Sequence, residues 1–79
     1  MSKEIIQERA ESFIKEYLEH TGDRMDRISN KDLYSQYTEF TKFSMGKTKF
    51  NRLLMENGFM VAKAGGNVTT VFYIKSNWI

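Results

Sequence analysis

Residues 44–58 read SMGKTKFNRLLMENG. Gly46 belongs to a short polar break and Gly58 is a residue type that ends helices, so the pattern predicts a helix over about residues 47–57. At 100° per residue, one face of this helix is apolar and consists of Phe50, Leu53 and Leu54. The opposite face consists of Thr48, Asn51, Arg52 and Met55, and the basic residues Lys47 and Lys49 lie on its flanks. If this helix enters a DNA major groove, Arg52 can donate two hydrogen bonds to a guanine edge, while Thr48 and Asn51 contact bases or phosphates. The alternative is that this face of the helix is merely solvated.

A second helix is predicted immediately before that break. Ser29 opens a Ser-x-x-Asp pattern that resembles a capping box, in which the hydroxyl accepts from a backbone N–H of the first turn. The helix is expected to end near Lys42 or Phe43, and its apolar stripe consists of Leu33, Tyr34, Tyr37, Phe40 and Phe43. Two helices joined by a short turn that contains glycine are the signature of a helix-turn-helix.

The last third of the chain changes its pattern. Residues 59–64 and 68–75 are rich in β-branched and aromatic residues, which predicts two strands. Gly65, Gly66 and Asn67 lie between them and can supply the positive φ angles of a tight hairpin turn. Such a hairpin can lie along a sugar–phosphate backbone as a wing, with Lys63, Asn67 and Lys75 as its contacts, or it can be a plain connection.

The N-terminal segment predicts one more helix. Over residues 3–20 the apolar side chains recur at alternating spacings of three and four, with Ser2 as the expected cap and residues 21–23 as the stop. Residues 24–28 are expected to be extended. The resulting order of elements predicts an α+β fold, a winged helix-turn-helix of three helices with a C-terminal two-stranded β-hairpin wing, as a single domain over residues 1–79.

Composition limits the classes of function. The chain has 79 residues and no cysteine, which excludes a disulfide framework, a thiolate metal site and a cysteine nucleophile. The net charge of +2 is unevenly distributed: residues 1–20 carry three basic and five acidic side chains, whereas residues 47–79 carry five basic side chains and one acid, Glu56. This excess of basic side chains in the C-terminal half favours an anionic partner for that half.

Several of these residues together resemble a known family. The resemblance rests on Asp32-Leu33-Tyr34, on Tyr37, on the run from Gly46 to Leu54, and on Gly58-Phe59 followed by a basic hairpin. These motifs are similar to the C-terminal winged-helix segment of phage and plasmid replicative primase-helicases of the poxvirus and satellite-phage type. The resemblance covers about residues 28–75 and implies a DNA-binding module of a mobile genetic element, with a replication-associated or regulatory role, isolated or as a stand-alone protein.

Catalysis, metals and cofactors are not expected. Gly46-Lys47-Thr48 matches the end of a phosphate-binding loop but lacks the first glycine of that motif, because position 41 is a threonine. His20 is the one histidine, which argues against a metal site, and we expect it to be a favourable charge at the end of the first helix. The acidic pairs of the first helix, such as Glu8 and Glu11, are interpreted as its solvated side.

The expected partner is nucleic acid, and double-stranded DNA in particular. The alternative is a winged-helix protein-interaction module without DNA binding, which would use an apolar surface of Met45, Met55, Met60, Trp78 and Ile79. A protein partner or a homodimer is a further possibility. Trp78 can equally pack back on the first helix, and most other aromatic side chains are expected in the core. No segment predicts a signal peptide or a membrane span, so the expected location is the cytoplasm of a bacterial host cell.

Overall fold

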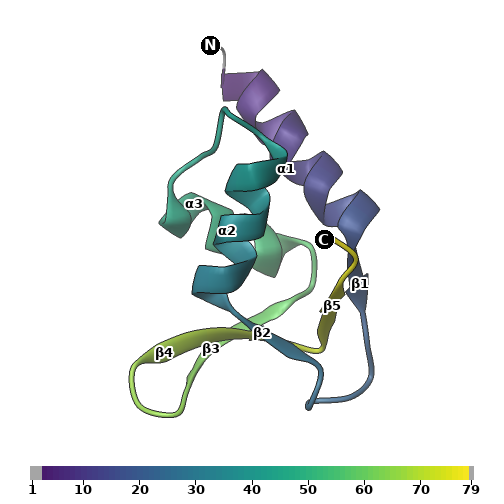
Figure 1. Cartoon of the computed structure of the whole chain (residues 1–79), viewed down its shortest axis with the longest axis vertical. Helices are drawn as coiled ribbons and strands as arrows, with labels where there is room; N and C mark the ends of the chain where they lie inside the picture. Colours follow the sequence, from purple (N-terminus) through teal and green to yellow (C-terminus); the bar gives the residue numbers. More distant parts are fainter. Residues whose placement is uncertain (1–2, 79) are drawn as a thin grey trace.

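The computed structural model describes residues 3–78, which form three helices and five short strands in the order α1-β1-β2-α2-α3-β3-β4-β5 (Figure 1). The helices are α1 (Lys3–Tyr17), α2 (Asn30–Phe40) and α3 (Lys47–Glu56). The strands are β1 (Leu18–His20), β2 (Arg27–Ser29), β3 (Met60–Ala64), β4 (Val68–Phe72) and β5 (Ile74–Ser76). The predicted α+β class and its three helices are therefore confirmed.

The strands form two small antiparallel sheets rather than the single two-stranded hairpin that the sequence predicts. In the larger sheet the order is β2-β4-β3, so that Thr70 of β4 lies between Ser29 of β2 and Ala62 of β3. The smaller sheet pairs β1 with β5. The segment predicted as extended before α2 thus becomes an edge strand beside β4.

The chain leaves the hairpin at Tyr73, whose φ of 58° lies in the left-handed region. Backbone hydrogen bonds hold this bend on both sides: Thr21 N–H donates to the Tyr73 carbonyl at 2.9 Å, and Ile74 N–H donates to the Asp26 carbonyl at 3.1 Å. The second hairpin strand therefore ends at Phe72, and the predicted extension to Lys75 is wrong.

The first helix is three residues shorter than predicted. It ends at Tyr17, and Leu18, Glu19 and His20 form β1 instead, because their backbone groups pair with β5. The prediction that His20 lies at a helix end is therefore wrong, and its ring stacks on Phe59 with the centroids 3.9 Å apart. The cap predicted at Ser2 lies outside the described residues.

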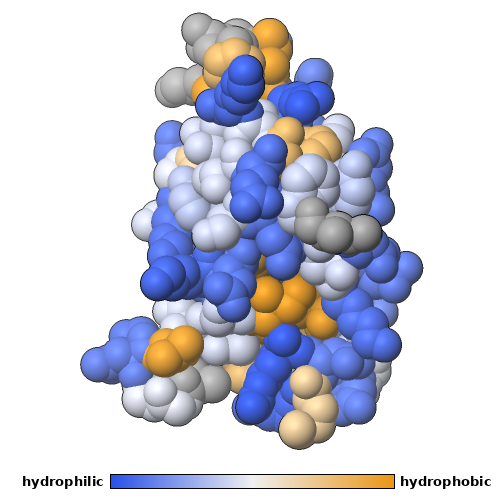
Figure 2. Space-filling view, viewed as in Figure 1, coloured by the Kyte–Doolittle hydropathy of each residue, from blue (hydrophilic) through white to orange (hydrophobic). Residues whose placement is uncertain are grey.

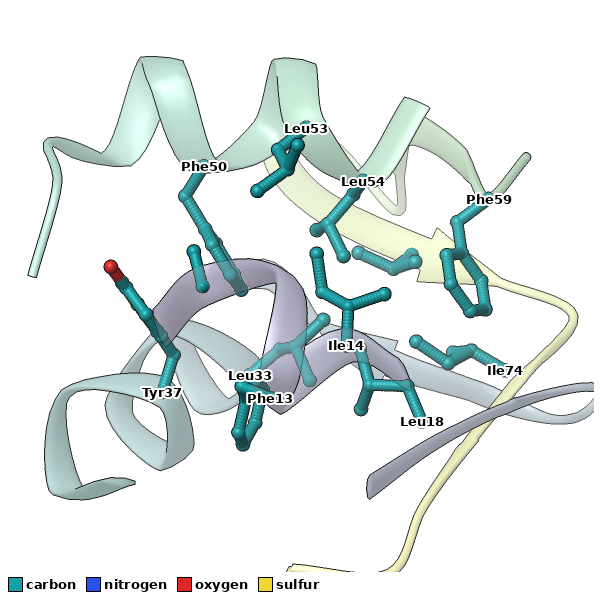
Figure 3. Close-up of a cluster of buried hydrophobic side chains, with 12 residues drawn as sticks. Phe13, Ile14, Leu18, Leu33, Tyr37, Phe50, Leu53, Leu54, Phe59 and Ile74 are labelled. Carbon is teal, nitrogen blue, oxygen red and sulfur yellow. The ribbon is translucent and has the colours of Figure 1, made fainter. Parts of the chain in front are cut away.

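Aromatic and aliphatic side chains from all three helices and from the strands β1, β4 and β5 fill one core (Figure 3). Phe13 of α1 lies at its centre, within ring-contact distance of Tyr37, Phe40 and Phe50. The expectation that most aromatic side chains belong to the core is confirmed. Phe43 is an exception: it is 45% exposed, because α2 ends at Phe40 rather than near Lys42 or Phe43.

Trp78 packs back onto the helices, which decides between the two alternatives for this residue. Its ring meets Tyr17 edge-on at 5.1 Å and Phe40 at 5.8 Å, and its indole N–H donates to Glu39 at 3.2 Å. The end of the described chain thus closes the core between α1 and α2. None of the helices within residues 3–78 is long and apolar enough to cross a membrane.

Candidate nucleic-acid interface

A groove of about 390 Å³ lies where the N-terminal ends of α2 and α3 face the tip of the β3–β4 hairpin. In Figure 1 the hairpin projects away from the helices on the side where α3 begins. The groove is lined by Ser29, Asn30, Lys31, Lys47, Thr48, Asn51, Asn67, Val68 and Thr69. These lining residues include two lysines and no acid, so the groove offers a positive, hydrogen-bonding surface.

The α2 wall of the groove is built by a helix cap. The Ser29 hydroxyl accepts from the Asp32 backbone N–H at 3.2 Å, which confirms the cap predicted from the sequence. A capped helix start still directs its first free N–H groups outward, and they carry partial positive charge. Lys31, exposed in the first turn, adds a full positive charge at the same place.

Two tyrosines of α2 fix where α3 begins. The Tyr34 hydroxyl donates to the Met45 carbonyl at 2.7 Å, and the Met45 N–H donates to the Tyr37 hydroxyl at 3.0 Å. The Tyr37 ring also stacks on Phe50 with centroids 4.5 Å apart (Figure 3). Burial raises the pKa of Tyr37, the hydrogen bond from Met45 opposes that rise, and neighbouring Tyr34 adds to it. The carbonyl and the N–H group of Met45 thus both hold the turn between α2 and α3 against α2.

The polar side of α3 is divided between two surfaces. Lys47, Thr48 and Asn51 line the groove, and the Lys47 ammonium also lies 5.9 Å from the centre of the Tyr34 ring. Lys49 and Arg52 lie on the other flank, in a hollow that they share with Gln7 of α1 and Glu56. The five polar residues of α3 predicted to contact DNA are therefore exposed or half-exposed, but they do not form one patch.

Asn30 and Asn51 join the two helices across the floor of the groove. The Asn30 side-chain NH₂ group donates to the Asn51 side-chain carbonyl oxygen. Asn30 is only 3% exposed, whereas Asn51 is half-buried. This bond leaves the Asn51 NH₂ group as the polar end of that side chain available to the groove.

The hairpin supplies the third wall. Gly65 and Gly66 adopt φ angles of 60° and 79°, which allow the tight turn that brings Asn67 to the groove. Lys63 is exposed on β3 directly opposite Thr69, and directly paired residues project from the same face of a sheet. Lys63 therefore lies on the face of the hairpin that borders the groove.

Lys75, the remaining predicted contact, lies elsewhere. It belongs to β5, opposite Glu19 of β1, on the side of the molecule away from the hairpin tip (Figure 1). The structure does not bring Lys75 together with the groove residues.

Five lining residues escaped the sequence prediction: Ser29, Asn30, Lys31, Val68 and Thr69. The cap at Ser29 was a usable signal, since it places the first turn of α2 and hence Lys31 at a helix start. No comparable signal existed for Val68 and Thr69, because their position depends on the pairing of β4 with both neighbouring strands.

The apolar surface considered as an alternative is only partly present. Met45 and Trp78 pack against the core, whereas Met55 and Met60 are exposed by 53% and 42%, and Ile79 lies outside the described residues. In the view of Figure 2, hydrophobic residues appear as several small areas within a mostly hydrophilic face.

The residues considered for acid–base chemistry lie apart from the groove. Glu8 and Glu11 are on the outer side of α1, where the Gln7 amide donates to Glu11 at 3.4 Å. Within residues 3–78 no three histidine, aspartate or glutamate side chains form a cluster of metal-binding size.

Comparisons of the chain with protein-family models, with curated proteins and with solved structures find no match. The likeness to primase-helicase winged-helix segments therefore rests on the sequence motifs alone.

Proposed function

We propose that this chain is a winged-helix module that binds double-stranded DNA without catalysis, with α3 in the major groove and the β3–β4 hairpin as the wing. The observation that carries the proposal is the groove itself. Three elements that are distant in sequence converge there with lysine, amide and hydroxyl side chains and with no acidic lining residue.

The dimensions and chemistry of α3 suit this role. A B-DNA major groove is about 12 Å wide and admits one α-helix. Thr48 is exposed near the start of α3, and Asn51 follows almost one turn later, so both can reach base edges. Lys31 and Lys47 flank them at two helix starts, where phosphate oxygens are favourably bound.

The two flanks of α3 would face the two strands of the duplex. A helix lying in the major groove has one phosphate backbone on each side. Lys47 and the hairpin face one backbone, and Lys49 with Arg52 face the other. The division of the basic residues that the structure shows is thus compatible with one duplex bound along α3.

The biological setting is proposed from the sequence motifs. Their resemblance to phage and plasmid primase-helicase segments supports a replication-associated or regulatory role in a mobile genetic element, in the cytoplasm of a bacterial host. A phosphate-dominated interface of this kind would bind duplex DNA with a strong dependence on salt.

Fluorescence anisotropy with labelled duplex DNA at several salt concentrations tests the proposal. Three to five phosphate contacts give a log–log slope of about −3 to −5 between affinity and salt. We expect Lys31→Glu/Lys47→Glu to weaken binding at least about tenfold and to reduce the slope by about two, because two phosphate contacts become repulsive.

A matched double variant, Lys15→Glu/Lys75→Glu, controls for overall charge. Each Lys→Glu change removes two units of charge, so both double variants change the net charge from +2 to −2. Near-wild-type binding by the control supports the groove as the site. Equal loss in both variants would show that only net charge matters, and no duplex binding by the wild type at low salt would refute the proposal in favour of a protein partner.

A further inference from the structure

The hydrogen-bonded pair of side-chain amides that joins α2 to α3 bears on which base the groove selects. Asn30, the first residue of α2, is almost fully buried and directs its NH₂ group at the carbonyl oxygen of Asn51. A side-chain oxygen engaged in this way is turned toward α2 and away from the groove. The Asn51 NH₂ group is then the end that meets a ligand.

Base edges differ in what they require from such a side chain. Adenine presents one acceptor and one donor in the major groove, and an asparagine grips it with both its oxygen and its nitrogen. Guanine presents two acceptors, N7 and O6. An asparagine with only its NH₂ group exposed matches guanine, and it cannot complete the two-bond grip on adenine.

We propose that Asn30 determines base specificity by holding the Asn51 carboxamide in this orientation, so that the base pair facing Asn51 is selected for guanine over adenine. The inference rests on the proposed binding of duplex DNA and specifies the sequence read by that same groove. Asn30 acts as a positioning residue, since it is buried and contacts the base only through Asn51.

The orientation can be reversed by one substitution. Asn30→Asp replaces the donating NH₂ group by an oxygen that only accepts, so Asn51 must turn its own NH₂ group inward and expose its oxygen. The new negative charge lies in the first turn of α2, where the helix dipole favours it. An exposed oxygen selects a base edge with a donor, which is the N4 amino group of cytosine or the N6 amino group of adenine.

Selection from a pool of duplexes with a randomised core, followed by sequencing, tests the inference. The wild type is expected to enrich guanine over adenine by about tenfold at one position, the size of one good base contact. Asn51→Ala should lose the preference at that position alone, and Asn30→Asp should shift it to cytosine or adenine. Asn77→Asp, an equal change of charge outside the groove lining, should keep the wild-type preference.

The outcomes separate this inference from the proposed function. Enrichment of adenine by the wild type, or an unchanged guanine preference in folded Asn30→Asp, overturns the role of Asn30 while duplex binding stands. If Asn30→Asp does not fold, as judged by circular dichroism, the wild-type preference still tests the orientation of Asn51. A guanine preference that Asn51→Ala loses supports this orientation, and an adenine preference overturns it. A wild type that binds no duplex overturns the inference and the proposed function together.

Discussion

At the scale of single residues, Tyr37 links the core to the proposed interface. Its ring stacks on Phe50 in the core, and its hydroxyl accepts from the Met45 N–H immediately before α3. The same residue therefore contributes apolar burial and sets the place where α3 begins. Its raised pKa has a consequence for stability in alkaline solution.

Tyr37→Phe keeps the ring and removes the hydroxyl, which leaves the Met45 N–H without its acceptor. We expect a loss of about 1 kcal/mol in the free energy of unfolding near neutral pH, measured by denaturant titration. Because the folded-state pKa of Tyr37 is raised, the folded protein holds this proton more tightly than the unfolded chain does. The wild type should therefore lose stability as the pH rises above about 10, the ordinary pKa of tyrosine.

The comparison with the variant isolates that effect from other alkaline titrations. Tyr37→Phe should lose less stability than the wild type over the same rise in pH, so the two curves converge. Parallel curves would contradict the assigned burial of the Tyr37 hydroxyl.

At the scale of elements, the locally encoded features were predictable and the long-range ones were not. The cap at Ser29, the extent of α3 and the turn at Gly65 and Gly66 depend on neighbouring residues, and the structure contains all three. The sequence prediction extended the first helix to His20, because Leu18 continues its apolar spacing. Pairing of β1 with β5 overrides that local preference. The residues near His20 contain no pattern that predicts pairing with a strand so distant in the sequence.

The candidate site was predictable to a similar extent. Helical spacing correctly separated the buried from the exposed side of α3, but it could not show that Lys47 and Lys49 face different neighbours. That division depends on where α1 and the hairpin lie around the helix. Lys75 was misplaced for the same reason, since the bend at Tyr73 redirects the chain away from the hairpin.

The hairpin turn provides a test at this scale. Gly66 has a φ of 79° with open space around it, so Gly66→Ala meets no clash but adopts a strained backbone conformation. We expect a loss of about 1 kcal/mol in the free energy of unfolding. Gly22→Ala is the matched control, because Gly22 also has open space but no positive φ, and its effect should be neutral or stabilising by about 0.5 kcal/mol. Equal effects of the two substitutions, measured by thermal denaturation, would contradict the assigned turn.

At the scale of the whole molecule, the elements that close the core and the elements that form the groove lie on different sides. The smaller sheet lies beside α1, and the β3–β4 hairpin projects on the other side of the molecule (Figure 1). Trp78 closes the core between α1 and α2, whereas the groove lies at the hairpin tip. The acidic side chains Glu4, Glu8 and Glu11 on the outer side of α1 and the basic groove therefore occupy different parts of the surface. A bound duplex would be attracted to the groove and repelled by the outer side of α1.

The most direct test of this account is a nuclear magnetic resonance titration of the ¹⁵N-labelled protein with a short DNA duplex. If duplex DNA binds in the groove, the largest changes in amide chemical shift should occur in the first turns of α2 and α3 and at residues 65–69, with little change in β1 and β5. Changes confined to α1 or to the β1–β5 sheet, or no change at low salt, would contradict the assignment of the groove as a DNA-binding site.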